Sequence, residues 1–163
     1  MIKQLLVIML LPFCSVALAE YPELADRVLV AKAEKKLYLI KDGVPFLEFP
    51  IALSPKPKGH KREQGDERTP EGRYILDFKN HDSDFYKSIR ISYPNQQDLN
   101  RAELNGVDPG GAIMIHGMPN ESSLPASLIQ QFNWTDGCIA VTNGAMDEIW
   151  AAVEAGTPIE IQP

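Results

Sequence analysis

The segment 135–141 contains the side chain best suited to chemistry, the thiol of Cys138. The cysteine follows Gly137 and begins an apolar run. Glycine permits close backbone approach and unusual dihedral angles, and backbone N–H groups at such a turn can hold the oxyanion that forms when a thiolate attacks a carbonyl. The alternative is an inert cysteine that packs as a small hydrophobe, and this segment alone leaves both interpretations open.

A second candidate is His116, which ends the apolar run 113–115 and precedes Gly117. In isolation, a histidine at such a position is more often a core residue whose ring nitrogens are satisfied. A cysteine and a histidine that meet in space supply a nucleophile and its base, because the thiolate is the reactive species. His116 and Cys138 lie 22 positions apart, which allows a strand, a short helix and a return strand. We therefore expect them to meet at the ends of neighbouring strands.

The first 19 residues have the pattern of a secretory signal peptide. Lys3 precedes an apolar run over residues 5–18, and Ala-Leu-Ala at 17–19 supplies the small residues of a cleavage site. We expect residues 1–19 to be removed and the protein to be periplasmic or otherwise extracytoplasmic, with no membrane span after cleavage. A retained N-terminal anchor is the alternative. Loss of Cys14 leaves Cys138 as a lone thiol, which in an oxidising compartment indicates burial, intermolecular pairing or a reactive role.

The composition argues against several classes of partner. The sequence carries a formal net charge of -6, and an acidic protein is a poor ligand for nucleic acid, whose phosphates require clustered Lys and Arg. The same reasoning disfavours binding to anionic lipid headgroups. Residues 20–163 show no internal repeat and no low-complexity linker, so we expect them to form a single domain.

The elements that must position these residues are predominantly strands. Short segments rich in β-formers are separated by glycine and proline turns, a pattern typical of a sandwich or barrel. Asp42-Gly43 is a two-residue hairpin signal. Helices are expected at 124–132 and 146–153, the second with apolar residues at i, i+3, i+4 and i+7. Strands are expected at 27–32, 36–41, 44–53, 72–78, 88–93, 112–116, 137–142 and 158–162.

The remaining histidines and the long loop 54–71 are less specific. The loop contains His60, three prolines and a dense mixture of charges, so it is either a mobile segment beside a substrate cleft or a solvated surface loop. His81, Asp82 and Asp84 could together bind a metal but lack a recognised ligand spacing. We therefore predict no metal site.

Together, these motifs resemble the signature of the L,D-transpeptidase catalytic domain of the YkuD type. That signature is His-Gly, a spacer and Ser/Thr-x-Gly-Cys-Ile/Val-Arg, and it is matched by His-Gly at 116–117 and Thr-Asp-Gly-Cys-Ile at 135–139. Thr-Pro-Glu-Gly at 69–72 resembles the family's Thr-Pro-x-Gly segment before a central strand. The resemblance covers about residues 27–162, the size of one domain. The sequence departs from the signature at Ala140, where the family has Arg, and so resembles a divergent branch.

The resemblance implies an L,D-transpeptidase-like β-sandwich or barrel with one or two short helices, and a cysteine acyltransferase acting on peptidoglycan stem peptides. Cys138 would be the nucleophile that forms a thioester acyl-enzyme and His116 its general base, while the backbone of Gly137, Cys138 and Gly117 would support the oxyanion. No metal or organic cofactor is implied.

The implied partners are stem peptides and either an amine acceptor or a wall-linked protein. The implied roles are cell-wall biogenesis and cell shape. Transfer of the acyl group to an amine is transpeptidation. Transfer to water would make the chain a hydrolytic relative, an L,D-carboxypeptidase, endopeptidase or amidase acting on diaminopimelate-linked bonds.

Substrate contacts are expected from five residues: Trp134, Thr135, Asp136, Tyr74 and Arg90. The Arg that the family carries two positions after the cysteine is a fixed bidentate donor for a carboxylate or a carbonyl. Its absence leaves transpeptidation and hydrolysis both open. The arginines that could take its place in space are Arg73, Arg90 and Arg101.

Two other classes of function compete with this interpretation. A catalytically silent wall-binding module is motivated by the missing Arg, but binding alone would need neither Cys138 nor His116. An unrelated secreted cysteine protease ranks last, because the motif neighbourhoods of such proteases are absent from the sequence.

Overall fold

The computed structural model describes residues 23–163, which open with a three-stranded antiparallel meander. β1 (Arg27–Ala31) pairs with β2 (Lys36–Lys41), which turns through Asp42-Gly43 into β3 (Val44–Pro50). Asp42 and Gly43 have φ angles of 49° and 80°, and a two-residue hairpin turn of this kind requires positive φ at both positions. The predicted hairpin is therefore confirmed.

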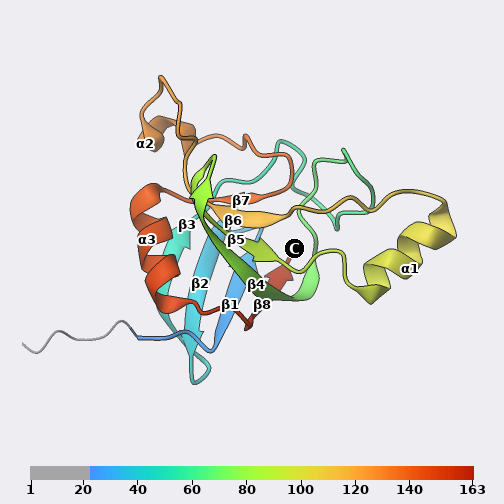
Figure 1. The fold of residues 1–163 in the computed structure, drawn as a ribbon, viewed down its shortest axis with the longest axis horizontal. Coiled ribbons are helices and arrows are strands. Elements are labelled where there is room, and N and C mark those ends of the chain that lie inside the picture. Colours follow the sequence, from blue (N-terminus) through green and yellow to red (C-terminus); the bar gives the residue numbers. More distant parts are fainter. Residues whose placement is uncertain (1–22) are drawn as a thin grey trace, which may run out of the picture.

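The other strands extend this meander into one mixed sheet of eight strands in the order β3-β2-β1-β8-β4-β5-β6-β7. β8 (Thr157–Gln162), at the end of the chain, lies between β1 and β4, parallel to the first and antiparallel to the second (Figure 1). The remaining strands are β4 (Gly72–Ser83), β5 (Tyr86–Ile91), β6 (Met114–His116) and β7 (Ile139–Ala140).

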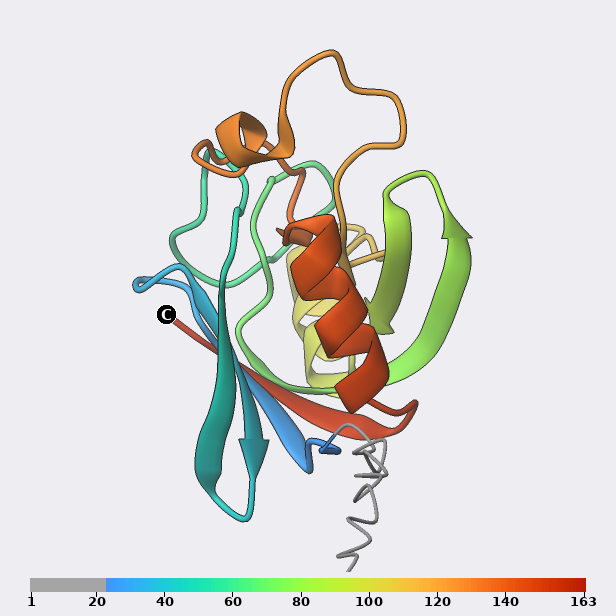
Figure 2. The same cartoon turned by 90° about the vertical axis from the view of Figure 1, so that its left-hand side faces the viewer.

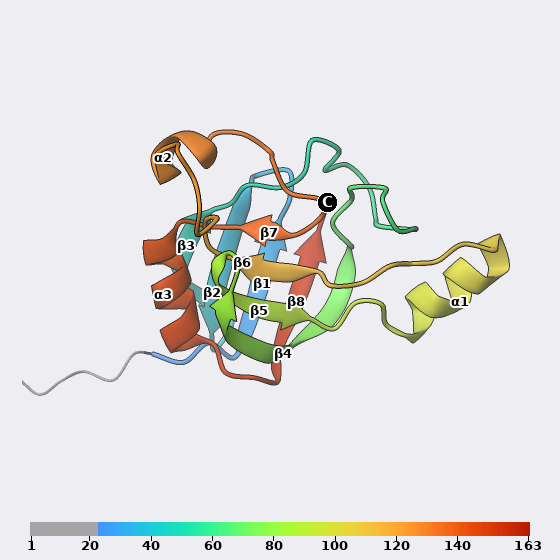
Figure 3. The same cartoon turned by 45° about the horizontal axis from the view of Figure 1, so that its top comes forward.

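The two ends of this sheet meet beside the predicted site. Ala52, which follows β3, and Ala140 of β7 exchange backbone hydrogen bonds of 2.8 and 2.9 Å. In Figure 3 the strands β5, β6 and β7 cross in front of β2, β1 and β8, so the sheet is folded into two layers. Joining the outer strands in this way leaves fewer open edges. The expected mostly β sandwich or barrel is confirmed.

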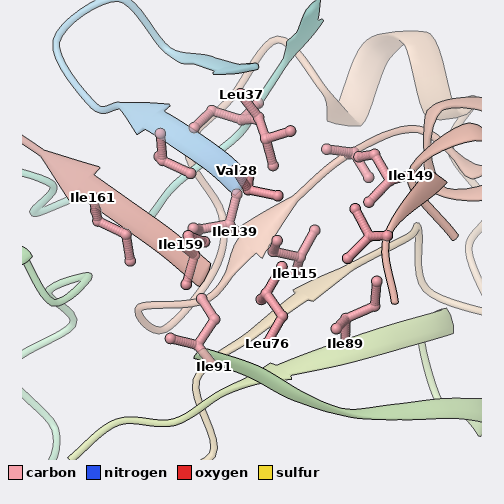
Figure 4. Packing of buried hydrophobic residues seen from close by; sticks show 14 of the residues in the cluster. Val28, Leu37, Leu76, Ile89, Ile91, Ile115, Ile139, Ile149, Ile159 and Ile161 are labelled. Atoms are coloured by element: carbon pink, nitrogen blue, oxygen red, sulfur yellow. The ribbon is translucent and has the colours of Figure 1, made fainter. Parts of the chain in front are cut away.

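The hydrophobic core lies between the two layers. Figure 4 shows side chains from both halves of the sheet converging there, among them Val28, Leu37, Leu76 and Ile115. Because successive side chains on a strand point to opposite faces, the strands contribute alternate residues to this core. Val28 and Val30 of β1, for example, are both fully buried.

α3 (Asn143–Ala152) packs against the core along one side of the molecule (Figure 2). Met146 and Ile149 are fully buried, so the predicted apolar face of this helix is confirmed. The helix begins three residues earlier than the expected range 146–153, because the Thr142 side chain caps it by accepting the Ala145 N–H at 3.2 Å.

Two further helices complete the fold of residues 23–163, which therefore has three helices where the sequence predicts one or two. α2 (Ala126–Ile129) is a single turn within the expected range 124–132. α1 (Gln96–Asn105) is not predicted, because it lacks an apolar stripe, and it projects away from the sheet (Figure 1). Its local signal is a capping box, in which Asn95 and Asp98 satisfy one another's backbone N–H groups.

The loop 54–71 is fixed by two buried lysines, Lys32 outside the loop and Lys61 within it. Lys32, 5% exposed, donates to Glu71 at 2.8 Å and to the carbonyl of Thr69 at 3.2 Å. Lys61, 3% exposed, pairs with Asp66 at 2.9 Å. Burying a lysine ammonium is costly unless it is paired and hydrogen-bonded, so these contacts fix the loop. They argue against the expected mobile lid.

The predicted signal peptide, residues 1–19, lies outside the described residues. Within residues 23–163, no helix has the length and apolar character needed to cross a membrane.

Replacing Ile139 by Ala should destabilise the protein, because its side chain is fully buried in the core. Large-to-small changes of this kind cost about 2–5 kcal/mol. The matched control is Ile75→Ala, since Ile75 is 39% exposed on β4 and should cost less than about 1 kcal/mol. Urea unfolding followed by circular dichroism measures both. Equal losses in the two variants would contradict the packing described for β7.

Candidate active site

The pairing of β6 with β7 brings Cys138 and His116 to one face of the sheet. These strands are parallel, with Ile115 opposite Ile139 and His116 opposite Ala140. Ile115 and Ile139 are fully buried in the core. Since side chains alternate along a strand, His116 and the residue before Ile139, which is Cys138, point to the other face. This register places the two residues on neighbouring strands and on the same face of the sheet.

Both side chains line one pocket with a volume of about 560 Å³. Its walls come from the turn that joins β4 to β5, from β6 and the residue Ala112 before it, and from the segment 134–138. Three carboxylates, those of Asp82, Asp84 and Asp136, are among the lining side chains, whereas no Lys or Arg of residues 23–163 is. The pocket therefore suits a substrate group that carries positive charge or donates hydrogen bonds.

His116 is 4% exposed and is held in one tautomer. Its Nδ1 lies 2.7 Å from the carbonyl oxygen of Gly117. A carbonyl can only accept, so Nδ1 carries the proton and Nε2 presents its lone pair. The imidazole ring packs against the rings of Phe85 and Trp134, with centroid distances of 4.6 and 5.5 Å. Burial lowers the pKa of His116, and the hydrogen bond to Gly117 opposes this in part.

Cys138 is partly exposed and its thiol is free. Burial raises the pKa of the thiol, the nearby carboxylate of Asp136 raises it further, and a backbone hydrogen bond at Met114 and the charge of Lys61 lower it. The sulfur lies 3.5 Å from the carbonyl of Ala112, to which the S–H can donate. A raised thiol pKa beside a lowered imidazole pKa favours a neutral pair over a thiolate–imidazolium pair.

The turn before the cysteine is fixed by Thr135 and Gly137. The Thr135 hydroxyl donates to the Cys138 carbonyl at 2.8 Å, and the Thr135 N–H donates to the carbonyl of Leu53 at 3.1 Å. Gly137 has φ of 115°, and a Cβ at this position would lie 2.7 Å from the Arg68 carbonyl oxygen. Glycine is needed at 137 for both reasons. The predicted motif is thus a tight turn packed against the end of the loop 54–71.

The two glycines predicted to support the oxyanion differ in what their N–H groups do. The Gly137 N–H reaches the Thr135 hydroxyl at the long distance of 3.4 Å, so it can be redirected to a ligand. The Gly117 N–H donates to the carbonyls of Phe85 and Lys87, both at 3.1 Å, and is not free for an oxyanion. Gly117 acts instead through its carbonyl, which holds His116.

Three of the five expected substrate contacts line the pocket, namely Trp134, Thr135 and Asp136. The indole Nε1 of Trp134 is buried and has no hydrogen-bond partner within residues 23–163, so it can donate to a bound molecule. The Thr135 hydroxyl is already used within the turn.

The other two expected contacts, Tyr74 and Arg90, lie elsewhere, which corrects the prediction for both. Tyr74 is 4% exposed and donates to Asp98 at 2.9 Å, tying β4 to α1. Arg90 makes a bidentate pair with Asp77, at 2.8 and 3.2 Å, on exposed side chains of the β4–β5 ribbon. Strand alternation turns Tyr74 into the core, whereas Arg90 shares the outer face of β5 with Ser88 but pairs with Asp77 and does not line the pocket.

The other candidate replacements for the missing Arg are also placed away from the pocket. Arg73 is exposed near Glu160, and Arg101 lies 3.3 Å from Asp98 on α1. The pocket wall that sequence reasoning missed is the β4–β5 turn, with Asp82, Asp84 and Phe85. Its only sequence signal is the polar run 80–84, which had been weighed as a metal site. No group of three potential ligands for a metal ion is found in residues 23–163.

Comparison with known proteins agrees with this geometry. The sequence matches the L,D-transpeptidase catalytic domain (YkuD) over residues 25–161. It is 36% identical over 119 residues to the YafK protein of Escherichia coli (strain K12), a match that covers 71% of this chain and 38% of YafK. The chain thus spans well under half of that relative.

Solved structures share the fold. The helical cell shape determining protein Pgp2 from Campylobacter jejuni superposes with a TM-score of 0.60 and 26% identity, covering 88% of this chain and 51% of Pgp2. An L,D-transpeptidase from Xylanimonas cellulosilytica superposes with a TM-score of 0.53 and 17% identity, covering 86% of this chain and 61% of that one. The sequence match over residues 25–161 and the shared fold lead to one assignment: the chain belongs to the L,D-transpeptidase catalytic domain family.

Proposed function

We propose that this protein is a cysteine-dependent enzyme that modifies peptidoglycan stem peptides through a thioester on Cys138. The observation that carries the proposal is the placement of Cys138 and His116 in one pocket, with Nε2 of the imidazole left as the acceptor. Membership of the family supports the substrate class. A catalytically silent wall-binding module is disfavoured, because binding would not require a nucleophile beside a base in a fixed tautomer.

The first half of the proposed reaction forms the acyl-enzyme. His116 Nε2 takes the S–H proton as the Cys138 sulfur attacks the carbonyl carbon of the scissile amide. The oxygen becomes an oxyanion, which backbone N–H groups at Gly137 and Cys138 would hold. The C–N bond then breaks, His116 returns its proton to the departing amine, and a thioester remains on the sulfur.

The second half decides between two activities. In transpeptidation an acceptor amine attacks the thioester, His116 takes the amine proton, and the thiolate leaves and is reprotonated. In hydrolysis water takes the same role. Ala140 in place of Arg, together with the absence of Lys and Arg from the pocket lining, leaves the donor carboxylate with less support. This observation favours the hydrolytic alternative, an L,D-carboxypeptidase, endopeptidase or amidase on diaminopimelate-linked bonds.

The cellular setting is part of the proposal. We infer an extracytoplasmic, and in particular periplasmic, location from the predicted signal peptide 1–19, and a role in cell-wall biogenesis from the family. The printed name of Pgp2 concerns helical cell shape, which supports a role in cell shape here. An amine of the wall or a wall-linked protein would be the acceptor or the released group.

Removal of the sulfur should end turnover. Cys138→Ala and Cys138→Ser should give no detectable product from purified muropeptides, because a hydroxyl does not ionise near neutral pH. His116→Ala should lower kcat by about 100- to 10,000-fold, the contribution of a general base. Mass spectrometry of the products measures all three variants.

The matched control for the histidine is His81→Ala. His81 is exposed on β4, and this variant should keep wild-type turnover. Full activity in Cys138→Ala would disprove the proposed mechanism in both its forms.

The fate of the acyl-enzyme separates the two activities. Wild-type protein is incubated with tetrapeptide muropeptides and an excess of an amine acceptor. Given the poorly supported donor site, we expect free tripeptide to exceed cross-linked product. A cross-linked product that dominates with excess amine, while tripeptide stays minor, would assign transpeptidation.

The pH dependence of kcat/KM should show a neutral catalytic pair. Burial lowers the pKa of His116 below its ordinary value of 6.5 and raises the pKa of Cys138 above its ordinary value of 9.0. The basic imidazole therefore persists to lower pH, so the acid limb should lie below pH 6.5, followed by a plateau up to about pH 9. In His116→Ala, residual activity should instead rise with thiol ionisation towards high pH. An acid limb centred above pH 6.5 in the wild type would argue against the neutral pair.

A further inference from the structure

One side chain, Asn120, joins the β4–β5 turn to the segment that follows β6. The Asn120 Oδ1 accepts the Tyr86 N–H at 2.9 Å, and its Nδ2 donates to the Ser83 carbonyl at 2.8 Å. Its own N–H donates to the Asp84 carbonyl at 3.0 Å. Figure 2 shows the turn between these two strands beside the segment that leaves β6. Asn120 therefore satisfies backbone groups of the turn that have no strand beside them to pair with.

The turn that Asn120 holds is in direct contact with the imidazole. Phe85 packs its ring on His116, with a centroid distance of 4.6 Å, and the Phe85 carbonyl accepts the Gly117 N–H at 3.1 Å. The Gly117 carbonyl in turn accepts from His116 Nδ1 at 2.7 Å. A continuous chain of contacts thus runs from Asn120 through Phe85 and Gly117 to the proposed base.

The turn needs such support. Tyr86 has φ of 66°, a left-handed conformation that is unfavourable for a bulky residue and persists only where surrounding contacts enforce it. The pairing between β4 and β5 is irregular just before the turn, between Asn80 and Ser83. Phe85 itself is 37% exposed, and its ring packs on those of His116 and Trp134.

We propose that Asn120 is a positioning residue for His116: it fixes the β4–β5 turn so that Phe85 covers the imidazole and the Gly117 carbonyl sets its tautomer. The proposal rests on the proposed function only in assigning the base to His116. Asn120 touches neither the thiol nor the carbonyl that it attacks. Its effect would pass through Phe85.

The test follows the imidazole itself, so it does not depend on turnover. The chain contains three histidines, and NMR signals of His116 are assigned by comparison with His60→Ala and His81→Ala. In wild-type protein we expect a His116 titration below the ordinary value and an Nδ1–H tautomer. In Asn120→Ala the Phe85 ring should move away from His116, so that water reaches the imidazole. The pKa of His116 should then rise, and its neutral form should become a mixture of the two tautomers.

The titratable groups that face His116 constrain this test. Asp82 and Asp84 come from the same turn, and Asp136 and Cys138 come from the segment across the pocket. A looser turn carries its two carboxylates with it. Asn120→Asp keeps an acceptor for the Tyr86 N–H and loses the donor to Ser83, and its titration is compared at high ionic strength, which screens the carboxylate that it adds. It should shift the His116 midpoint less than Asn120→Ala does.

Turnover supplies the second readout. Asn120→Ala should lower kcat by about ten- to a hundredfold, the scale expected for a misplaced catalytic group, with a smaller change in KM. Phe85→Leu should lower kcat similarly, and the double variant should be no worse than either single one if Asn120 acts through Phe85. The matched control is Asn100→Ala, an exposed residue of α1, which should leave both readouts at wild-type values.

The outcomes distinguish the two proposals. A wild-type His116 titration and wild-type kcat in Asn120→Ala would overturn the positioning role, whatever the reaction is. If that variant fails to fold by circular dichroism, Asn120→Asp and Phe85→Leu carry the same test, and unchanged titrations in both would overturn it. Additive losses in the double variant would also overturn it. A wild-type protein inactive on muropeptides would defeat the proposed function and leave the titration test standing.

Discussion

The parallel register between β6 and β7 is the constraint on which the rest of the structure depends. β7 has two residues, yet Ile139 fills the core, while Ala140 pairs with His116 on one side and bonds to Ala52 on the other. A slip of one residue would turn Cys138 into the core and Ile139 into the pocket. Burial of apolar side chains on one face of the sheet therefore fixes the strand register, and this register places Cys138 and His116 on the other face. In this domain the stability of the core and the geometry of the site cannot be separated.

The same burial sets the protonation state of the pair. The aromatic rings of Phe85 and Trp134 and the sheet beneath exclude water from His116, and the surroundings of Cys138 likewise disfavour a charged thiolate. A resting ion pair would be the costlier state in such a place. A neutral thiol resists oxidation better than a thiolate does, which would suit a cysteine in the extracytoplasmic location proposed above. In the proposed reaction, charge then develops only when the sulfur attacks a substrate carbonyl and turns its oxygen into an oxyanion. The substrate brings hydrogen-bond partners of its own to the pocket.

The sequence identifies two residues of the pocket, Cys138 and His116, but predicts less of the walls around them. Cys138 and His116 are found from residue type beside glycine, and the strands from alternation and turns, because both signals are local. Tyr74 is misplaced because a one-residue uncertainty in strand phase sends a side chain to the wrong face. Arg90 is misplaced because its exposed side chain pairs with Asp77 instead of lining the pocket. The β4–β5 turn reaches the pocket only through tertiary contacts such as those of Asn120, for which no local pattern exists. α1 has a polar surface, so only its capping residues could have revealed it.

The departure at Ala140 follows from how the sheet closes. Ala140 is fully buried, with its N–H and carbonyl bonded to Ala52, and its carbonyl also accepts from Gln130 Nε2 at 3.2 Å. The same Nε2 donates to the Pro50 carbonyl at 3.1 Å. The Gln130 amide thus supplies two donors to backbone carbonyls, which a guanidinium fork could also do, but it brings no charge. An arginine at 140 would place a cation among backbone groups that are already paired, and burying that charge without a partner would be costly. Breaking the hydrogen bonds of Ala52 or Gln130 to make room for it would add to this cost.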